Sequence, residues 1–181
     1  AVTGALTVQN AFGSGTTADK LTIIGTGPHL TGFEPGSGVA GTEVKLHGRN
    51  LDRATADEFG GVNAAAFHAP APTQITVTVP PDARSGPVKL LSAQGDFTSA
   101  APFYLSPRLA KPEILAAKPG DVVEFGGRNF LGLDSLHIGG QAVAFEVVGN
   151  DKLKFTVFEN LFGGGIKLAA PGGQWISTNS F

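Results

Sequence analysis

Apolar and polar residues alternate along much of the chain. The stretch TEVKLHG places Val44 and Leu46 on one side of an extended backbone, and TQITVTVP does the same with Ile75 and Val77. A period of two is typical of a β-strand with one buried face. No window of a dozen residues shows the 3.6-residue period of an amphipathic helix. The pattern therefore predicts an all-β protein.

Glycine and proline interrupt these alternating stretches. The 181 residues include 26 Gly and 12 Pro, which is well above ordinary usage. Both residue types favour turns, because Gly adopts positive φ angles and Pro fixes φ at about −65°. Short alternating stretches between such turns predict antiparallel sheets made of many short strands.

The sequence contains an internal repeat. LHGRNL at residues 46–51 returns as FGGRNF at residues 125–130, an offset of 79 positions. After the loss of one residue the offset becomes 78, and the alignment continues to the end of the chain. Further aligned pairs are Pro28 with Pro107, Val44 with Val123, Gly60 with Gly139, Val88 with Ile166, Gly95 with Gly173 and Phe97 with Trp175. A match of this length predicts two copies of one domain, residues 28–105 and residues 106–181.

The first 27 residues align with the end of the same domain at a third offset, 82. The aligned pairs include Gly4 with Gly86, Leu6 with Val88, Val8 with Leu90 and Thr17 with Ser99. We therefore predict that residues 1–27 are the C-terminal hairpin of a partial preceding repeat. A lone two-stranded hairpin is only marginally stable in water. We expect the chain to be a slice of a longer array, with the partial repeat completed in cis or by another chain.

Three stretches of the first copy carry a recognisable pattern: EPGSGVAGTEVKLHGRNL, FGGVNAAAF and ITVTVPPDARSGPVKLLSAQGDFTSAAPF. This pattern resembles the IPT/TIG domain, an immunoglobulin-like fold shared by transcription factors, plexins and many prokaryotic exported proteins. Residues 107–181 match it less fully, with Ile114 in place of Pro35 and Phe158 in place of Pro80. The resemblance implies tandem immunoglobulin-like β-sandwiches.

The repeated Gly-Arg-Asn motif has a structural explanation. A side chain at Gly48 or Gly127 would obstruct the turn at a strand end. Asn50 and Asn129 can hydrogen-bond the backbone of the next turn or adopt a left-handed conformation. The next residue, Leu51 or Phe130, is expected to turn back into the core. Only the arginines of the motif have no required structural role.

The charge balance and composition exclude several functions. The formal net charge is −2, with 13 Lys and Arg against 15 Asp and Glu. DNA binding by analogy with transcription factors is therefore disfavoured, because phosphate neutralisation needs clustered cations. The absence of cysteine excludes disulfides, thiolate metal sites and cysteine nucleophiles. No apolar run approaches the ~20 residues that cross a bilayer, so we predict no membrane insertion.

No constellation of residues indicates catalysis. The four histidines show no metal-binding spacing such as H-x-x-x-H. Asp52, Asp57 and Glu58 fall in one predicted loop, where carboxylates can bind calcium, but a solvated polar loop is the simpler interpretation. The glycine-rich FGGGI has no helix after it to complete a phosphate site. We predict no enzyme activity, no catalytic residue, no cofactor and no metal.

Several functions remain open at this point. The first hypothesis is a structural, display or adhesion module, a stiff array of Ig-like domains in a larger extracellular, cell-surface or virion protein, such as a phage fibre, tail or decoration protein. The alternative is a glycan-binding accessory region of a polysaccharide-processing enzyme, which requires exposed aromatic residues. Trp175 is predicted to lie in the core, because it aligns with Phe97. Expected partners are other proteins, further copies of the chain joined through edge strands, or a cell-surface glycan.

The candidate partner surface consists of Arg49, Arg128, Phe130, Phe158 and Phe162. The two arginines are either salt-bridged surface residues or part of a contact surface. The three phenylalanines lie in the more divergent second copy. Exposed together, they would form an apolar patch of the kind that marks an interface.

Overall fold

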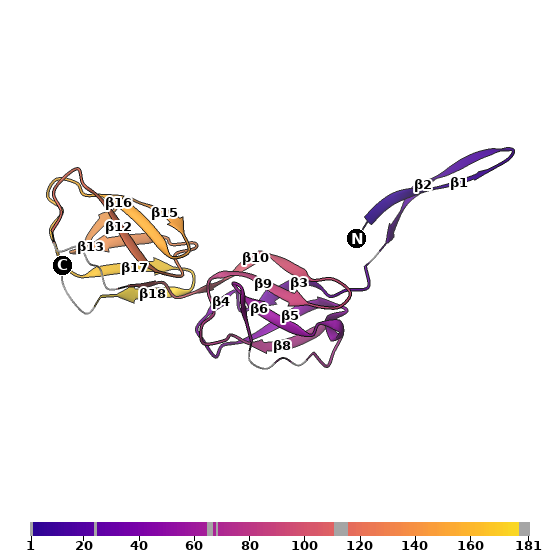
Figure 1. Cartoon of the computed structure of the whole chain (residues 1–181), viewed down its shortest axis with the longest axis horizontal. Helices are drawn as coiled ribbons and strands as arrows, with labels where there is room; N and C mark the ends of the chain where they lie inside the picture. The colour runs from indigo at the N-terminus through magenta and orange to yellow at the C-terminus, as the bar shows by residue number, and fades with distance from the viewer. Residues whose placement is uncertain (1, 24, 65–66, 68, 111–115, 178–181) are drawn as a thin grey trace.

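In the computed structural model the chain folds as a β-hairpin followed by two β-sandwiches (Figure 1). The structure describes residues 2–23, 25–64, 67, 69–110 and 116–177. We call residues 28–105 repeat 1 and residues 106–181 repeat 2. Within these described ranges every regular element is a strand except one 3-10 turn, which confirms the all-β, immunoglobulin-like prediction.

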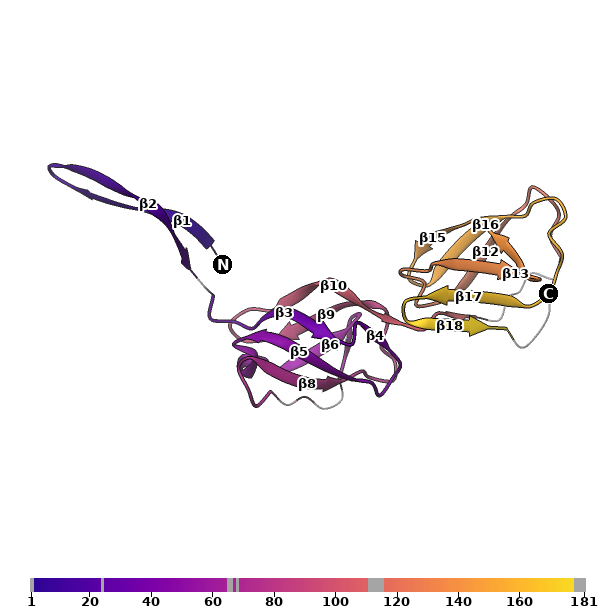
Figure 2. The same ribbon diagram turned by 180° about the vertical axis from the view of Figure 1, so that it is seen from behind.

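The hairpin consists of β1 (Val2–Asn10) and β2 (Gly13–Ile23), which pair antiparallel. Figures 1 and 2 both show it extending away from repeat 1. Every residue from 4 to 20 is exposed, including Leu6, Val8 and Phe12. The hairpin therefore has strand pairing but no core of its own.

Repeat 1 contains two sheets. The smaller sheet has the order β3–β5–β8, and the larger has the order β4–β10–β9–β6–β7. The strands are β3 (His29–Glu34), β4 (Ser37–Gly38), β5 (Glu43–Arg49), β6 (Ala56–Phe59), β7 (Val62–Asn63), β8 (Gln74–Thr78), β9 (Gly86–Leu91) and β10 (Phe97–Leu105). The 3-10 turn η1 (Leu51–Arg53) links the two sheets between β5 and β6.

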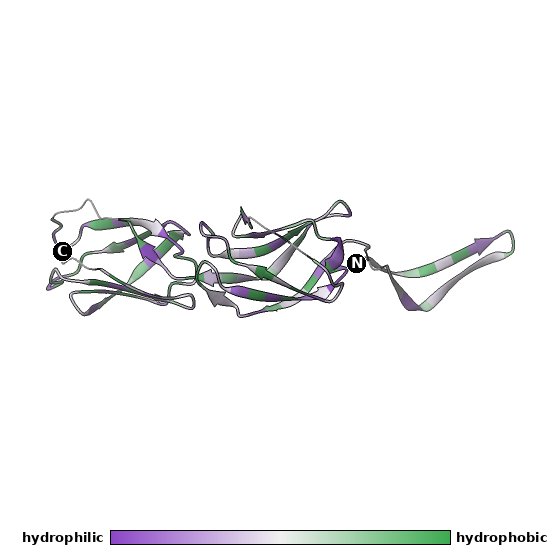
Figure 3. Ribbon diagram, turned by 90° about the horizontal axis from the view of Figure 1, so that it is seen from below, coloured by the Kyte–Doolittle hydropathy of each residue, from purple (hydrophilic) through white to green (hydrophobic). Residues whose placement is uncertain are grey.

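The alternating residues of the sequence form the core between these sheets. The inward residues of the smaller sheet are Val44, Leu46, Ile75 and Val77, and those of the larger sheet are Phe59, Val88, Leu90 and Phe103. Phe59 meets Phe103 edge to face with ring centroids 5.1 Å apart. Figure 3 shows the same alternation of hydropathy along the strands of both sandwiches.

Repeat 2 has the same architecture with four strands in each sheet, in the orders β11–β12–β16–β15 and β14–β13–β17–β18. The strands are β11 (Arg108–Leu109), β12 (Val122–Arg128), β13 (Ser135–Ile138), β14 (Gln141–Val143), β15 (Phe145–Gly149), β16 (Lys152–Thr156), β17 (Ile166–Ala170) and β18 (Gly173–Ile176). Its core includes Phe125, Leu153 and Leu168, and Trp175 packs against that core.

The Gly-Arg-Asn motif has the same conformation in both repeats. A Cβ at Gly48 would collide with the backbone oxygen of His29, and a Cβ at Gly127 would collide with that of Arg108. The asparagine that follows is left-handed in each case, with φ of 53° at Asn50 and 63° at Asn129. This conformation turns the chain inward, so the next residue, Leu51 or Phe130, is fully buried.

Candidate functional site: the joint between the repeats

The link between the two sandwiches is very short. Strand β10 ends at Leu105 and β11 begins at Arg108, so only Ser106 and Pro107 lie between them. Pro107 is buried and its ring restricts φ. The relative position of the repeats therefore depends on what contacts these two residues.

Asn129 contacts the link and the upstream repeat with one side chain. Its Nδ2 donates to the carbonyl oxygen of Ser106 over 3.0 Å. Its Oδ1 accepts from the N–H of Ser85 over 3.0 Å. Only 6% of Asn129 and 3% of Ser85 is exposed. The asparagine of the repeated motif therefore joins repeat 2 both to the link and to repeat 1.

Ser85 uses all of its polar groups at the joint. Its Oγ accepts from the N–H of Leu105 over 2.9 Å, which ties the loop before β9 to the end of β10. Its carbonyl oxygen accepts from Nδ2 of Asn150 over 2.7 Å. Asn150 in turn accepts the N–H of Leu131 at its Oδ1. Two asparagines of repeat 2 therefore hold one buried serine of repeat 1.

The tip of the β17–β18 hairpin holds the other side of the link. Oγ of Ser106 donates to the carbonyl oxygen of Gly172 over 2.6 Å. A Cβ at Gly172 would collide with the backbone of Leu105, and one at Gly173 would lie 2.5 Å from Oγ of Ser106. The link can lie against this tip only because the tip has no side chains there.

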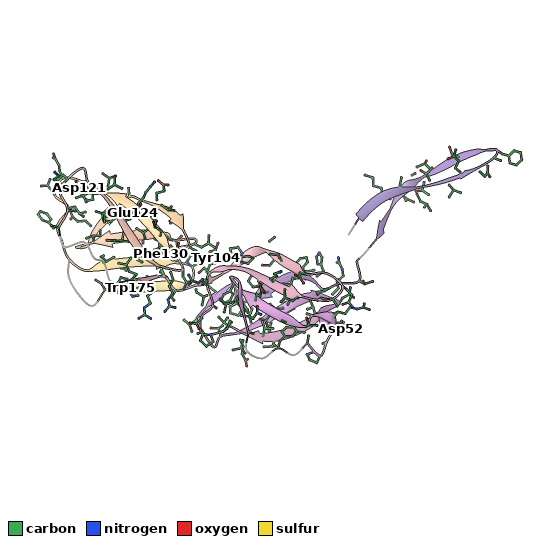
Figure 4. The ribbon with its side chains drawn as sticks, viewed as in Figure 1. Asp52, Tyr104, Asp121, Glu124, Phe130 and Trp175 are labelled. Carbon is green, nitrogen blue, oxygen red and sulfur yellow. The ribbon has the colours of Figure 1, made fainter. Side chains whose placement is uncertain are left out.

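Tyr104 adds an apolar contact between the repeats. A Cβ at Gly132, whose φ is +71°, would lie 2.6 Å from Cε1 of the Tyr104 ring. Figure 4 shows Tyr104 where the two sandwiches meet. The joint is therefore packed on several sides and not only hydrogen-bonded.

Repeat 1 makes an equivalent set of contacts with the segment that precedes it. Nδ2 of Asn50 donates to the carbonyl oxygens of Gly25 and Gly27 over 3.3 and 3.2 Å. A Cβ at Gly27 would lie 3.0 Å from the backbone oxygen of Gln94, at the tip of the β9–β10 hairpin. Gly27 and Gln94 align with Ser106 and Gly172. We call this arrangement of motif asparagine and hairpin tip the linker seat.

The sequence-predicted surface residues do not form one surface. Phe130 is fully buried, so its assignment to an exposed patch is wrong, because the left-handed Asn129 directs it inward. Arg128 is half-buried at the joint end of β12. Arg49 is likewise half-buried, at the end of β5 in the other repeat.

Phe158 and Phe162 are exposed by 39% and 67%, on a loop with a defined conformation. The N–H of Leu161 donates to Phe158 O over 3.2 Å, and Leu161 packs against the core. The side chain of Gln141 accepts the N–H of Phe162 and donates to Asn160 O. These contacts hold the loop that carries the two phenylalanines in one conformation.

This loop lies at the end of repeat 2 that is far from the joint. The N–H of Val157 donates to Asp121 O, and Figure 4 shows Asp121 at that far end. The equivalent loop of repeat 1 makes the same turn, with the N–H of Ala83 donating to Pro80 O, and then continues to Ser85. The loop that carries Phe158 and Phe162 therefore corresponds to the loop whose residue Ser85 contacts repeat 2.

The predicted acidic cluster is not a cluster in space. Asp57 and Glu58 are consecutive residues of β6 and point to opposite faces, and Asp57 is fully buried. Burial raises the pKa of Asp57 to about 6. Within the described ranges no three His, Cys, Asp or Glu side chains are grouped to hold a metal ion. His68 lies outside the described residues.

Sequence reasoning missed Ser85, Asn150, Gly172 and Tyr104 as joint residues. Ser85 and Gly172 align with Gly163 and Gln94, so the internal repeat gave no signal for them. In the part of the chain that the structure describes, no helix has the length and apolar character needed to span a bilayer.

The comparisons with known proteins agree with the fold. Residues 28–104 match the family model of the IPT/TIG domain. A search of curated proteins finds no match. A crystal structure with xylogluco-oligosaccharide is 16% identical with a TM-score of 0.51, covering 85% of this chain and 40% of that one.

Two further solved structures are more distant. The surface glycan-binding protein PbSGBP-B from Prevotella bryantii is 17% identical with a TM-score of 0.48, covering 87% of this chain and 43% of that one. The plexin A4 extracellular region is 19% identical with a TM-score of 0.38, covering 86% and 18%. This chain spans less than half the length of each protein. Residues 28–104 form an IPT/TIG domain.

Proposed function

We propose that the chain is a non-catalytic spacer in a larger extracellular surface protein, where stacked Ig-like repeats hold a binding region at a fixed distance and orientation. The observation that carries this proposal is the joint. A two-residue link is held by Asn129 on one side and by the tip at Gly172 on the other. A flexible tether would need none of these contacts.

The joint resists opening because its polar groups satisfy one another away from water. Four hydrogen bonds hold the joint: two connect Ser85 of repeat 1 with Asn129 and Asn150 of repeat 2, and two hold the link residue Ser106. Each buried hydrogen bond contributes about 1 kcal/mol net, and a buried group that loses its partner costs about 1–3 kcal/mol. A small rotation of one repeat against the other would break these hydrogen bonds before water could replace them. The free-energy cost of such a rotation favours one orientation of the two repeats.

The non-catalytic part of the proposal rests on the character of the titratable groups. Among the described residues Asp57 is the only group whose pKa is moved far from its ordinary value. A strongly shifted pKa at an accessible cleft would favour catalysis. Asp57 is fully buried in the core of repeat 1, so no substrate can contact it.

The distance between paired spin labels tests the spacer. The chain has no cysteine, so Thr78→Cys and Thr156→Cys supply two labelling sites at equivalent exposed positions of the two repeats. We expect a narrow distance distribution. Asn129→Gly keeps the left-handed backbone but removes the amide, and should broaden it. Asn50→Gly is the matched control, because it makes the same change away from this joint. A broad distribution in the parent would refute the spacer.

Glycan binding is the second candidate function, and the exposed pair of Phe158 and Phe162 favours it. Flat aromatic faces on a fixed loop suit the apolar faces of sugar rings. Trp175 is less suited, because it packs against the core. Calorimetry with xylogluco-oligosaccharide tests this candidate. Binding by the parent chain that is lost in the Phe158→Ala/Phe162→Ala variant would support glycan binding. If no heat of binding is detected at millimolar oligosaccharide, the spacer is the one candidate function that remains. A virion setting stays a prediction.

A further inference from the structure

We propose that the hairpin β1–β2 is the closing hairpin of another Ig-like repeat, and that its apolar face docks the remaining strands of that same repeat. This face of the hairpin, which carries Leu6 and Val8, is an interaction surface that, within the described ranges, contacts neither of the two complete sandwiches. The proposal is independent of whether the array acts as a spacer or binds a glycan. Three features of the hairpin carry it.

The first feature is the pairing register. Strands β9 and β10 pair Gly86 with Phe103, Pro87 with Pro102, Lys89 with Thr98 and Leu90 with Phe97. Strands β1 and β2 pair Gly4 with Leu21, Ala5 with Lys20, Thr7 with Thr16 and Val8 with Gly15. Each pair is displaced by the offset of 82, and the irregularity falls at the same place in both ladders. A free hairpin has no need of this bulge.

The second feature is a hydroxyl group that bridges the bulge. Thr17 Oγ1 accepts the N–H of Leu6 over 3.1 Å and donates to Asp19 O over 2.6 Å. Ser99 makes the equivalent bonds in repeat 1, to Val88 N and Ala101 O, over 2.9 and 2.6 Å. In repeat 2, Ser177 Oγ accepts the N–H of Ile166 over 2.8 Å. The bond from a strand N–H to the hydroxyl group is therefore common to all three hairpins, and the bond from the hydroxyl to a backbone carbonyl is common to the first two.

The third feature is an apolar face without a partner sheet among the described residues. Leu6 is 50% exposed and Val8 is 64% exposed. Their counterparts in the complete repeats are Val88 and Leu90, and Ile166 and Leu168, all of which are fully buried. In both complete repeats the strands that cover this face precede the hairpin in the chain. We therefore infer that the apolar face of Leu6 and Val8 is covered by the strands that precede Gly4 in the same repeat.

The linker seat of repeat 1 can contact a completed preceding repeat in the way that repeat 2 contacts repeat 1. Asn50 already holds the carbonyl oxygens of Gly25 and Gly27. At the joint between the repeats, Oδ1 of the equivalent Asn129 accepts the N–H of Ser85. The position 82 residues before Ser85 is Thr3. In the completed repeat the N–H of Thr3 would donate to Oδ1 of Asn50, which would reproduce the joint.

Thiol accessibility tests the proposal on a chain that has no other cysteine. Val8→Cys places a thiol on the apolar face, and Thr7→Cys places the matched control on the opposite face. Two chimeras supply the missing strands, residues 28–85 or residues 107–163, each joined directly before Gly4. In the parent chain both thiols should react rapidly. In at least one chimera the thiol at position 8 should react at least about 100-fold more slowly, while that at position 7 stays reactive.

Two outcomes would overturn the proposal. Equal reactivity at positions 7 and 8 in both chimeras, with circular dichroism showing that the two original sandwiches remain folded, would mean that the face does not accept these strands. Protection of position 8 in the parent chain that increases with protein concentration would mean that a second copy covers the face. Using two donor segments guards against a packing mismatch in either one.

Discussion

Asp57 gives a prediction about the pH dependence of stability. It lies in β6 and is fully buried, and neither carboxylate oxygen has a hydrogen-bond partner within the described ranges. Its counterpart in repeat 2 is Leu136, which is 1% exposed. A carboxyl group therefore occupies a position where the fold places a leucine. We expect Asp57→Leu to stabilise repeat 1, and to do so more strongly as the pH rises.

The magnitude follows from the pKa. Burial raises the pKa of Asp57 from 3.8 to about 6, and a smaller effect of the residue's own backbone, at a geometry that falls short of a regular hydrogen bond, opposes this rise. A shift of about 2 pKa units corresponds to about 3 kcal/mol. The folded state holds the proton more tightly than the unfolded state. The destabilising effect of Asp57 on the free energy of unfolding is therefore smallest below pH 3.8. It increases between about pH 4 and 6, and it stays constant at higher pH.

Urea denaturation at several pH values from 4 to 8 measures this effect. Trp175 is the only tryptophan and reports repeat 2, so its fluorescence serves as an internal control, while circular dichroism follows both repeats. The difference in unfolding free energy between Asp57→Leu and the parent should grow by about 2.5 kcal/mol from pH 4 to pH 7, because the unfolded carboxyl is already partly ionised at pH 4. A constant difference over this range would refute the reasoning, because an apolar gain alone does not depend on pH.

Three further substitutions test the motif and the joint. Gly127→Ala should destabilise repeat 2 by about 2–3 kcal/mol, because its Cβ would collide with the Arg108 backbone, whereas Gly126→Ala, with open space at its Cβ, should be neutral in the same urea titration. Ser85→Ala leaves the buried N–H of Leu105 unpaired and should lower the unfolding free energy by about 1–3 kcal/mol; a change below about 0.5 kcal/mol would contradict this. Gly172→Ala should broaden the distance distribution between the spin labels and leave both repeats folded, and an unchanged distribution would show that the hairpin tip does not hold the link.

The sequence predicts the sandwiches well, because the information is local and present twice. The alternation at Val44 and Leu46 specifies which side of β5 is buried, and the internal offset carries the prediction to Val123 and Phe125. The left-handed conformation expected for Asn50 and Asn129 occurs in both repeats. Their side chains hydrogen-bond the backbone of the preceding link, whereas the sequence predicts bonds to the backbone of the next turn. A side chain in that conformation points towards the preceding link.

The joint and Asp57 were harder to predict for different reasons. The contact of Ser85 with Asn129 connects two repeats, and no pattern within one repeat encodes it. The sequence predicts a loop at Asp57, whereas its alignment with the buried Leu136 indicates a core position, and the structure agrees with the alignment. For Phe130 the repeated motif predicts burial and the candidate surface predicts exposure, and the structure agrees with the motif.

The pairing of β4 with β10 determines how repeat 1 responds to mechanical force. Ser37 and Gly38 pair in parallel with Tyr104 and Leu105, and the N–H of Tyr104 donates to Gly36 O over 3.0 Å. One strand lies near the start of the repeat and the other is its last strand. A pull on the two ends therefore loads these hydrogen bonds in shear, so that they break together and not one after another. The strand that leads into the joint is thus also the one that resists extension of its own domain.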